Sequence, residues 1–114
     1  RYNSDTGTNY STTWLRGDGS AASSGRESNN TALIAGRVGY QSGMMSVNTI
    51  QIANYANTTT YKTVLSRSDS AANNTLALVS LWRSTSAINT IKVSAESGNF
   101  VSGSTFYLYG IKNS

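Results

Sequence analysis

The sequence predicts an all-β protein, an antiparallel β-sandwich with jelly-roll-like topology and about seven to eight strands. Short runs rich in Val, Ile, Leu, Tyr and Thr recur along the 114 residues, and clusters of Gly, Ser, Asn and Asp separate them. No window sustains apolar residues at helical spacing. This length suits one domain, so we expect residues 1–114 to form a single sandwich. Because the chain begins with Arg1 rather than Met, we expect it to be a module of a longer polypeptide.

Strand composition recurs seven times, and turn residues separate the segments. Gly17-Asp18-Gly19, Ser23-Ser24-Gly25, Asn73-Asn74 and Ser102-Gly103 are sequences at which a chain reverses readily, because Asn and Gly accept positive φ at low cost. The predicted strands are Tyr10 to Arg16, Ala32 to Val38, Ser46 to Asn54, Thr59 to Arg67, Thr75 to Arg83, Asn89 to Ala95 and Thr105 to Ile111.

Alternation along these segments predicts which side chains face the core. Successive side chains of a strand point to opposite faces, so residues two apart share a face. On this rule Ile50 and Ile52 point inward together. The same rule pairs Ile91 with Val93 and Phe106 with Leu108, and we expect these two pairs to meet in the core.

The segment from Leu76 to Trp82 is apolar on both faces. This pattern is typical of a strand that is covered on both sides. We therefore expect it to be a central strand or part of a surface buried in an oligomer.

Missing residue types exclude most familiar enzyme mechanisms. The chain has no Cys and no His, so it cannot build a zinc site of those ligands, a thiol nucleophile or a Ser-His-Asp triad by itself. The basic residues that give the net charge of +4 are scattered rather than clustered, which argues against nucleic-acid binding. No apolar run is long enough to span a bilayer. We expect no cofactor, no nucleic acid and no membrane partner.

Five carboxylates keep an enzymatic interpretation open as the weakest alternative. A glycosidase would need two of them facing each other across a cleft, whereas carboxylates beside Gly, Ser or Thr more often form turns. Calcium binding also stays open, although the regular Asp spacing of a calcium loop is absent. The residues are Asp5, Asp18, Glu27, Asp69 and Glu96.

The C-terminal third carries a pattern that resembles a known family. Residues 88–93 read I-N-T-I-K-V, and residues 99–111 read N-F-V-S-G-S-T-F-Y-L-Y-G-I. Together with the N-terminal residues 3–11, they are similar to a β-rich domain of virion structural proteins from tailed bacteriophages. In this resemblance Gly103, Phe106, Leu108 and Ile111 form the structural motif of a closing hairpin. The physical interpretation agrees, since Gly103 permits a tight turn while Phe106 and Leu108 enter the core.

The resemblance implies a non-enzymatic part of the virion surface, either a head decoration or cement protein or a tail or fibre component. Its partners would be other virion proteins and further copies of the chain, with a trimer as one assembly. The alternative function is a lectin-like module that binds a glycan or receptor of the host surface. Tyr and Trp suit both uses, because each combines a large contact area with one polar group. The candidate contact residues are Trp14, Tyr40, Tyr55, Tyr107 and Tyr109.

Overall fold

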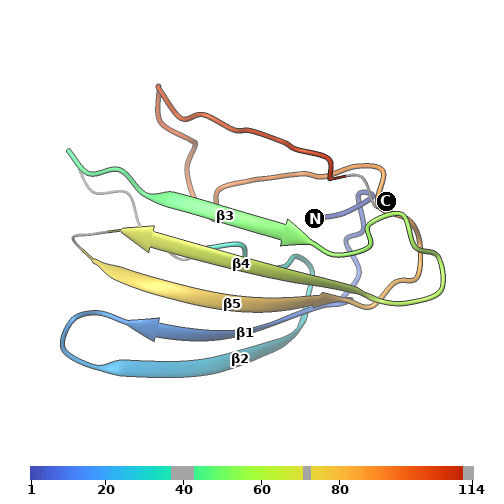
Figure 1. The fold of residues 1–114 in the computed structure, drawn as a ribbon, viewed down its shortest axis with the longest axis horizontal. Coiled ribbons are helices and arrows are strands. Elements are labelled where there is room, and N and C mark those ends of the chain that lie inside the picture. The colour runs from blue at the N-terminus through green and yellow to red at the C-terminus, as the bar shows by residue number, and fades with distance from the viewer. Residues whose placement is uncertain (37–42, 71–72, 112–114) are drawn as a thin grey trace.

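The computed structural model describes residues 1–36, 43–70 and 73–111, and within them the chain forms one antiparallel sheet and no helix (Figure 1). The all-β class is therefore confirmed. The described residues hold five strands rather than seven, and no second sheet. The order across the sheet is β2-β1-β5-β4-β3. The strands are β1 (Tyr10–Gly17), β2 (Ala22–Asn30), β3 (Val47–Ile52), β4 (Lys62–Ser70) and β5 (Asn74–Trp82).

Three predicted strands are not observed. Residues 32–36, the described part of the second segment, contain no strand. Residues 89–95 contribute only an isolated bridge between Ile91 and Tyr2, and residues 105–111 form no strand. Alternation supplies strand propensity, but a strand also needs a hydrogen-bonded neighbour over several residues. Residues 89–95 have a backbone neighbour only at residues 90–92, which pair with residues 1–3, and residues 105–111 have none among the described residues.

The sequence prediction missed β2 and placed a turn at Ser23-Ser24-Gly25 instead. β2 pairs with β1 along its length and is an edge strand, exposed at most of its positions. An edge strand with little buried surface needs few apolar side chains, which is why Ser and Asn dominate its sequence. Gly25 lies opposite Trp14 and leaves room for the indole ring.

β5 is the central strand, as predicted, but only one of its faces is buried. Leu76, Leu78, Ser80 and Trp82 are buried in alternation, whereas Val79 between them is exposed. β4 has the same alternation, with buried residues at every second position. Within one chain the sheet therefore has a covered face and an open face, so the second face of β5 is not buried there. Burial of that face in an oligomer stays a prediction.

The core is small and lies at one end of the covered face. It is built from Tyr2, Tyr10, Val64, Trp82 and Ile88, against which Leu33 and Ile52 pack. The rings of Tyr10 and Trp82 lie stacked with centroids 6.3 Å apart, and the ring of Tyr2 is tilted against that of Trp82 at 5.6 Å. Tyr10 and Trp82 are direct partners across β1 and β5, so strand register determines this contact.

Irregular segments rather than a second sheet cover this face. The Thr12 and Ser80 hydroxyls share a hydrogen bond of 2.8 Å, and Thr12 Oγ1 also accepts from the Ile34 amide at 3.2 Å. Residues 31–36, which we call the strap, thus lie across β1 and β5. The amide of Ile88 donates to the Tyr55 carbonyl at 2.8 Å, and the N-terminal segment joins residues 90–92 through backbone hydrogen bonds.

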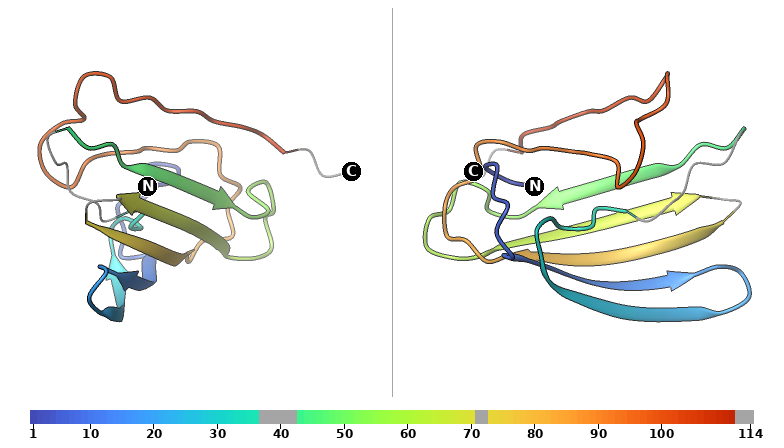
Figure 2. Two further views of the ribbon diagram at one scale, coloured as in Figure 1. Left: turned by 60° about the vertical axis from the view of Figure 1, so that its left-hand side comes forward. Right: turned by 180° about the vertical axis from the view of Figure 1, so that it is seen from behind.

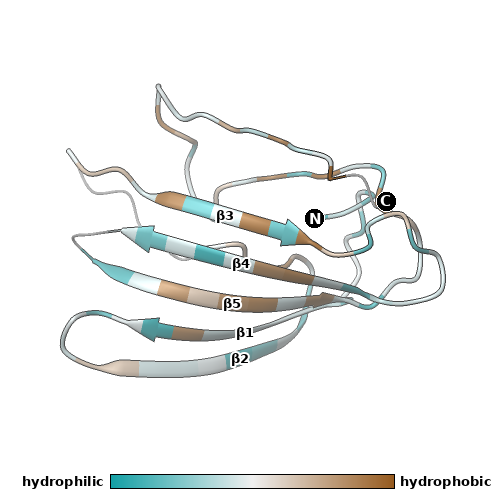
Figure 3. Cartoon of the chain, in the orientation of Figure 1, coloured by the Kyte–Doolittle hydropathy of each residue, from teal (hydrophilic) through white to brown (hydrophobic). Residues whose placement is uncertain are grey.

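The predicted inward pairs are only partly buried. Ile52 packs against the core as expected, whereas Ile50 beside it remains 39% exposed. Ile91, Val93, Phe106 and Leu108 are all exposed, so the expectation that they meet in the core is wrong. Hydrophobic residues, drawn brown in Figure 3, lie along β3, β4 and β5, and few lie along β2.

Candidate interaction surfaces

The C-terminal residues 97–111, which we call the arm, carry large apolar side chains that the rest of the chain does not cover. Phe106 is 61% exposed, Leu108 83% and Ile111 86%. The arm runs apart from the sheet, on the side of β3, in all the views of Figures 1 and 2. Within the described residues, no backbone hydrogen bond links the arm to another element. It therefore presents both apolar side chains and unpaired backbone groups.

The arm has internal order although it forms no strand. Gly103 has φ of 89°, and the Ser104 amide donates to the Val101 carbonyl at 3.1 Å. A glycine with positive φ at the third position of a four-residue turn is the type II pattern, so the predicted turn is confirmed. The rings of Phe100 and Phe106, on either side of this turn, meet edge to face at 4.9 Å.

Tyr107 and Tyr109 are exposed, and they are the predicted contact residues that the structure brings together. Their rings are stacked with centroids 6.4 Å apart, and their exposed fractions are 77% and 81%. Tyr55 is exposed in the β3–β4 connection, and its carbonyl accepts a hydrogen bond from the Ile88 amide. Trp14 is half-buried against Gly25 on the covered face. Tyr40 lies outside the described residues.

The outer edge of β3 is a second surface, which the sequence analysis did not single out. β3 pairs with β4 on one side and has no strand neighbour on the other among the described residues. Val47, Asn48, Thr49, Ile50 and Gln51 are all exposed. The strand contains no proline and no charged residue, which are the usual devices that keep edge strands from pairing.

The open face of the sheet carries a third set of exposed apolar residues. Val79 of β5 lies opposite Leu65 of β4 and diagonal to Leu15 of β1, and all three are exposed. Threonines lie beside them, so the apolar strip is narrow. Arg67 on the same face is paired with Asp69 at 2.9 Å.

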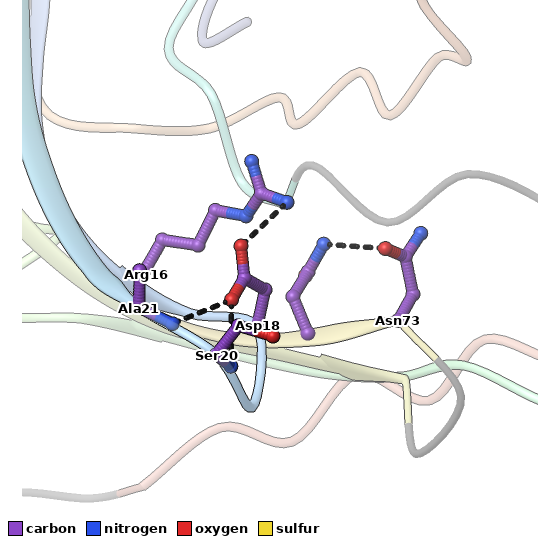
Figure 4. A network of polar contacts seen from close by, with 6 residues as sticks. Arg16, Asp18, Ser20, Ala21 and Asn73 are labelled. Carbon is purple, nitrogen blue, oxygen red and sulfur yellow. Dashed lines mark hydrogen bonds and ion pairs between the residues drawn. The ribbon is translucent and has the colours of Figure 1, made fainter.

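A pocket of about 340 Å³ lies at the covered face, away from the core. Trp14, Arg16, Leu76 and Glu96 line it. Arg16 is drawn toward the β1–β2 turn by Asp18, whose carboxylate lies 3.8 Å from the guanidinium (Figure 4). An aromatic ring, a cation and a carboxylate thus surround one small volume.

Hydrogen bonds within the fold occupy three of the carboxylates and lower their pKa values. Trp82 Nε1 donates to Asp5 at 2.7 Å, and this bond is the main reason why the pKa of Asp5 is lowered. The amides of Ala21 and Ser20 donate to the Asp18 carboxylate (Figure 4) and lower its pKa. The Thr75 hydroxyl lowers the pKa of Asp69 in the same way. These carboxylates are ionised at neutral pH, whereas a general acid needs a raised pKa.

The described ranges contain no group of three or more carboxylates that could hold a metal ion, and no helix that could cross a membrane. Comparison with protein-family models, with curated proteins and with solved structures finds no match to this chain.

Proposed function

We propose that this protein is a non-enzymatic structural component of a tailed-phage virion that acts by subunit association. The arm is the observation that carries the proposal. It presents Phe106, Tyr107, Leu108, Tyr109 and Ile111 to solvent in one continuous segment. Exposed apolar patches of this kind on a folded domain mark surfaces that bind other proteins.

Energetics favour association over solvent exposure. Burial of a large aliphatic or aromatic side chain stabilises by about 1.5–3 kcal/mol. Leu108 and Ile111 contribute little of this stabilisation within one chain, because both side chains are more than four-fifths exposed. The core of the chain is small and lies at one end of the sheet. Contacts with neighbouring subunits would therefore bury further apolar surface and stabilise the fold.

In this proposal, the jelly-roll-like sandwich forms only when subunits assemble. The described residues of one chain form one sheet with an open face and an edge at β3 that has no strand neighbour among them. A neighbouring subunit that covered the open face would add the second layer, and one that paired with the β3 edge would extend the sheet. The virion surface is the location that the resemblance of the C-terminal pattern implies, as head decoration or as part of a tail or fibre.

Sedimentation velocity of the chain is the first test. We expect association at micromolar concentration, and we expect the double variant Phe106→Asp, Leu108→Asp to sediment as a monomer with unchanged far-UV circular dichroism. Cryo-electron microscopy of particles that contain the chain should then place it at repeated positions on the outer surface. A chain that stays monomeric and separate from particles would contradict the proposal.

Glycan binding is the second candidate, and the Trp14 pocket favours it. Sugar sites combine an aromatic platform with charged hydrogen-bonding groups, which Trp14, Arg16 and Glu96 provide. A glycan array screened with the chain and with Trp14→Ala tests this function. Binding that depends on Trp14 would support it, and absence of binding across the array would count against it.

A further inference from the structure

We propose that the arm of one copy adds as a β-strand to the free edge of β3 in a second copy. This inference rests on the proposed association and names its partner and geometry. Four observations carry it: the unpaired edge, the unpaired arm, the apolar residues at both, and the absence of charge at both.

The backbone groups of the two segments are complementary. β3 is at the end of the sheet, and its outer side has no strand neighbour in the described part of the chain. Residues 105–111 form no backbone hydrogen bond with another described element. A free strand edge is a template for pairing with an extended segment, and main-chain hydrogen bonds then supply affinity. The six residues of β3 and the seven from Thr105 to Ile111 are well matched in length.

Alternation of side chains gives the pairing a definite orientation. In an added strand, Phe106 and Leu108 share one face while Tyr107 and Tyr109 share the other. On the covered face, Ile50 is 39% exposed next to Ile52 at the margin of the core. With Phe106 and Leu108 on that face, the arm would complete the cover over Ile50.

The absence of charge at both surfaces favours a second copy as the partner. The chain carries a net charge of +4, so association of two copies through charged surfaces would bring like charges together. Residues 38–61, which include β3, contain no Lys, Arg, Asp or Glu, and neither do residues 97–111. Both surfaces are therefore free of this repulsion, and the chain itself supplies each of them.

Reciprocal exchange would also bury enough area for a stable complex. Each arm has large side chains at Phe100, Phe106, Tyr107, Leu108, Tyr109 and Ile111. An aromatic side chain buries about 150–250 Å², so two arms reach the roughly 1,200–2,000 Å² of a stable interface. Reciprocal exchange closes a dimer, and head-to-tail addition closes a ring such as a trimer.

Thr49→Lys is the edge variant that tests this arrangement, with Thr13→Lys as its matched control. Both threonines are exposed strand residues on the open face, but Thr49 is on the edge strand and Thr13 is on the interior strand β1. We expect Thr49→Lys to raise the dissociation constant of self-association about tenfold or more, because pairing would desolvate the new charge. Thr13→Lys should leave it within about threefold.

Cysteine cross-linking tests the pairing directly, and the natural chain has no cysteine to interfere. Thr49→Cys and Tyr107→Cys are introduced into separate chains, mixed and oxidised. We expect a disulfide-linked species of twice the chain mass, which the pair Thr13→Cys and Tyr107→Cys should not give. In a chain with both Thr49→Cys and Tyr107→Cys, a link confined within one chain would overturn the proposal.

The outcomes separate this inference from the proposed function. Association that survives Thr49→Lys but is lost with Thr13→Lys would overturn edge pairing and point to the open face, while subunit association itself would stand. A natural chain that remains monomeric up to millimolar concentration, with no cross-link between copies, would overturn both.

Discussion

At the residue scale, the core depends on a few polar contacts that hold aromatic rings in place. Trp82 is buried, yet its indole N–H is satisfied by Asp5. Tyr10, also buried, accepts a hydrogen bond from the Tyr2 amide at 3.1 Å. The N-terminal segment is thus joined to the sheet by hydrogen bonds as well as by apolar contact. Burial raises the pKa values of the Tyr2 and Tyr10 phenols.

Replacement of Asp5 should show how much its hydrogen bond to the Trp82 indole contributes to the free energy of unfolding. We expect Asp5→Ala to lower the free energy of unfolding by about 1–3 kcal/mol, because the buried indole N–H loses its acceptor. Asp5→Asn keeps an oxygen acceptor and should cost less. Urea unfolding monitored by tryptophan fluorescence measures both, and equal losses in the two variants would mean that charge rather than the hydrogen bond matters.

Gly25 should tolerate no side chain. A Cβ at this position would lie 2.5 Å from Cζ2 of Trp14, so the indole ring would have to move. We expect Gly25→Ala to destabilise the fold by about 1–3 kcal/mol. Gly17→Ala is the control, since its Cβ would meet only Thr75 at 3.8 Å. Thermal unfolding compares the variants, and a Gly25→Ala protein as stable as the Gly17→Ala protein would contradict the packing.

At the element scale, the strap replaces part of the second sheet that a sandwich would have. It reaches from β1 across to β3 and β4, where Gly36 lies so close to Ser68 that a Cβ would collide with its hydroxyl. The strap carries only Leu33 into the core cluster. Its position therefore depends on hydrogen bonds to the sheet more than on apolar burial.

Thr12→Val should release the strap. The substitution preserves shape but removes the hydroxyl that accepts from Ile34 and pairs with Ser80. We expect faster hydrogen exchange at the Ile34 amide and a loss of about 1–3 kcal/mol in stability. Thr63→Val, on the exposed face of β4, should change stability by less than about 0.5 kcal/mol. Unchanged protection of Ile34 would argue against this tether.

At the scale of the whole molecule, stability should fall in acid. Asp5, Asp18 and Asp69 all have pKa values below the ordinary one, so the folded state holds their protons more weakly than the unfolded state does. Their contribution is fully present above the unfolded value of about 3.9 and is lost as pH falls through the lower folded values.

We therefore expect the urea midpoint to be constant from about pH 6 to pH 5 and to decrease below about pH 4. Unfolding curves at a series of pH values measure this profile. A midpoint that rises on acidification would contradict the sign of these shifts.

At the same scale, the arm leaves large apolar side chains exposed and forms no backbone hydrogen bond with another described element. The turn at Gly103 was predictable from a local rule, since glycine accepts positive φ. Where Phe106 and Leu108 lie was not predictable, because burial depends on which segment pairs with the arm. Their alternation is correct for a strand, but no partner for it lies within the described chain. The β3 edge could have been noticed from the charge-free sequence of residues 38–61.

The sequence by itself determined the all-β class, four of the five strands and the turns at Gly19 and Gly103. These features follow from local propensity and side-chain period, which act within a few residues. Tertiary structure decided that Ser-rich β2 forms an edge strand, that irregular segments cover one face, and that the arm stays apart. Those outcomes depend on contacts between residues far apart in the chain, and alternation within one segment carries no information about its partner.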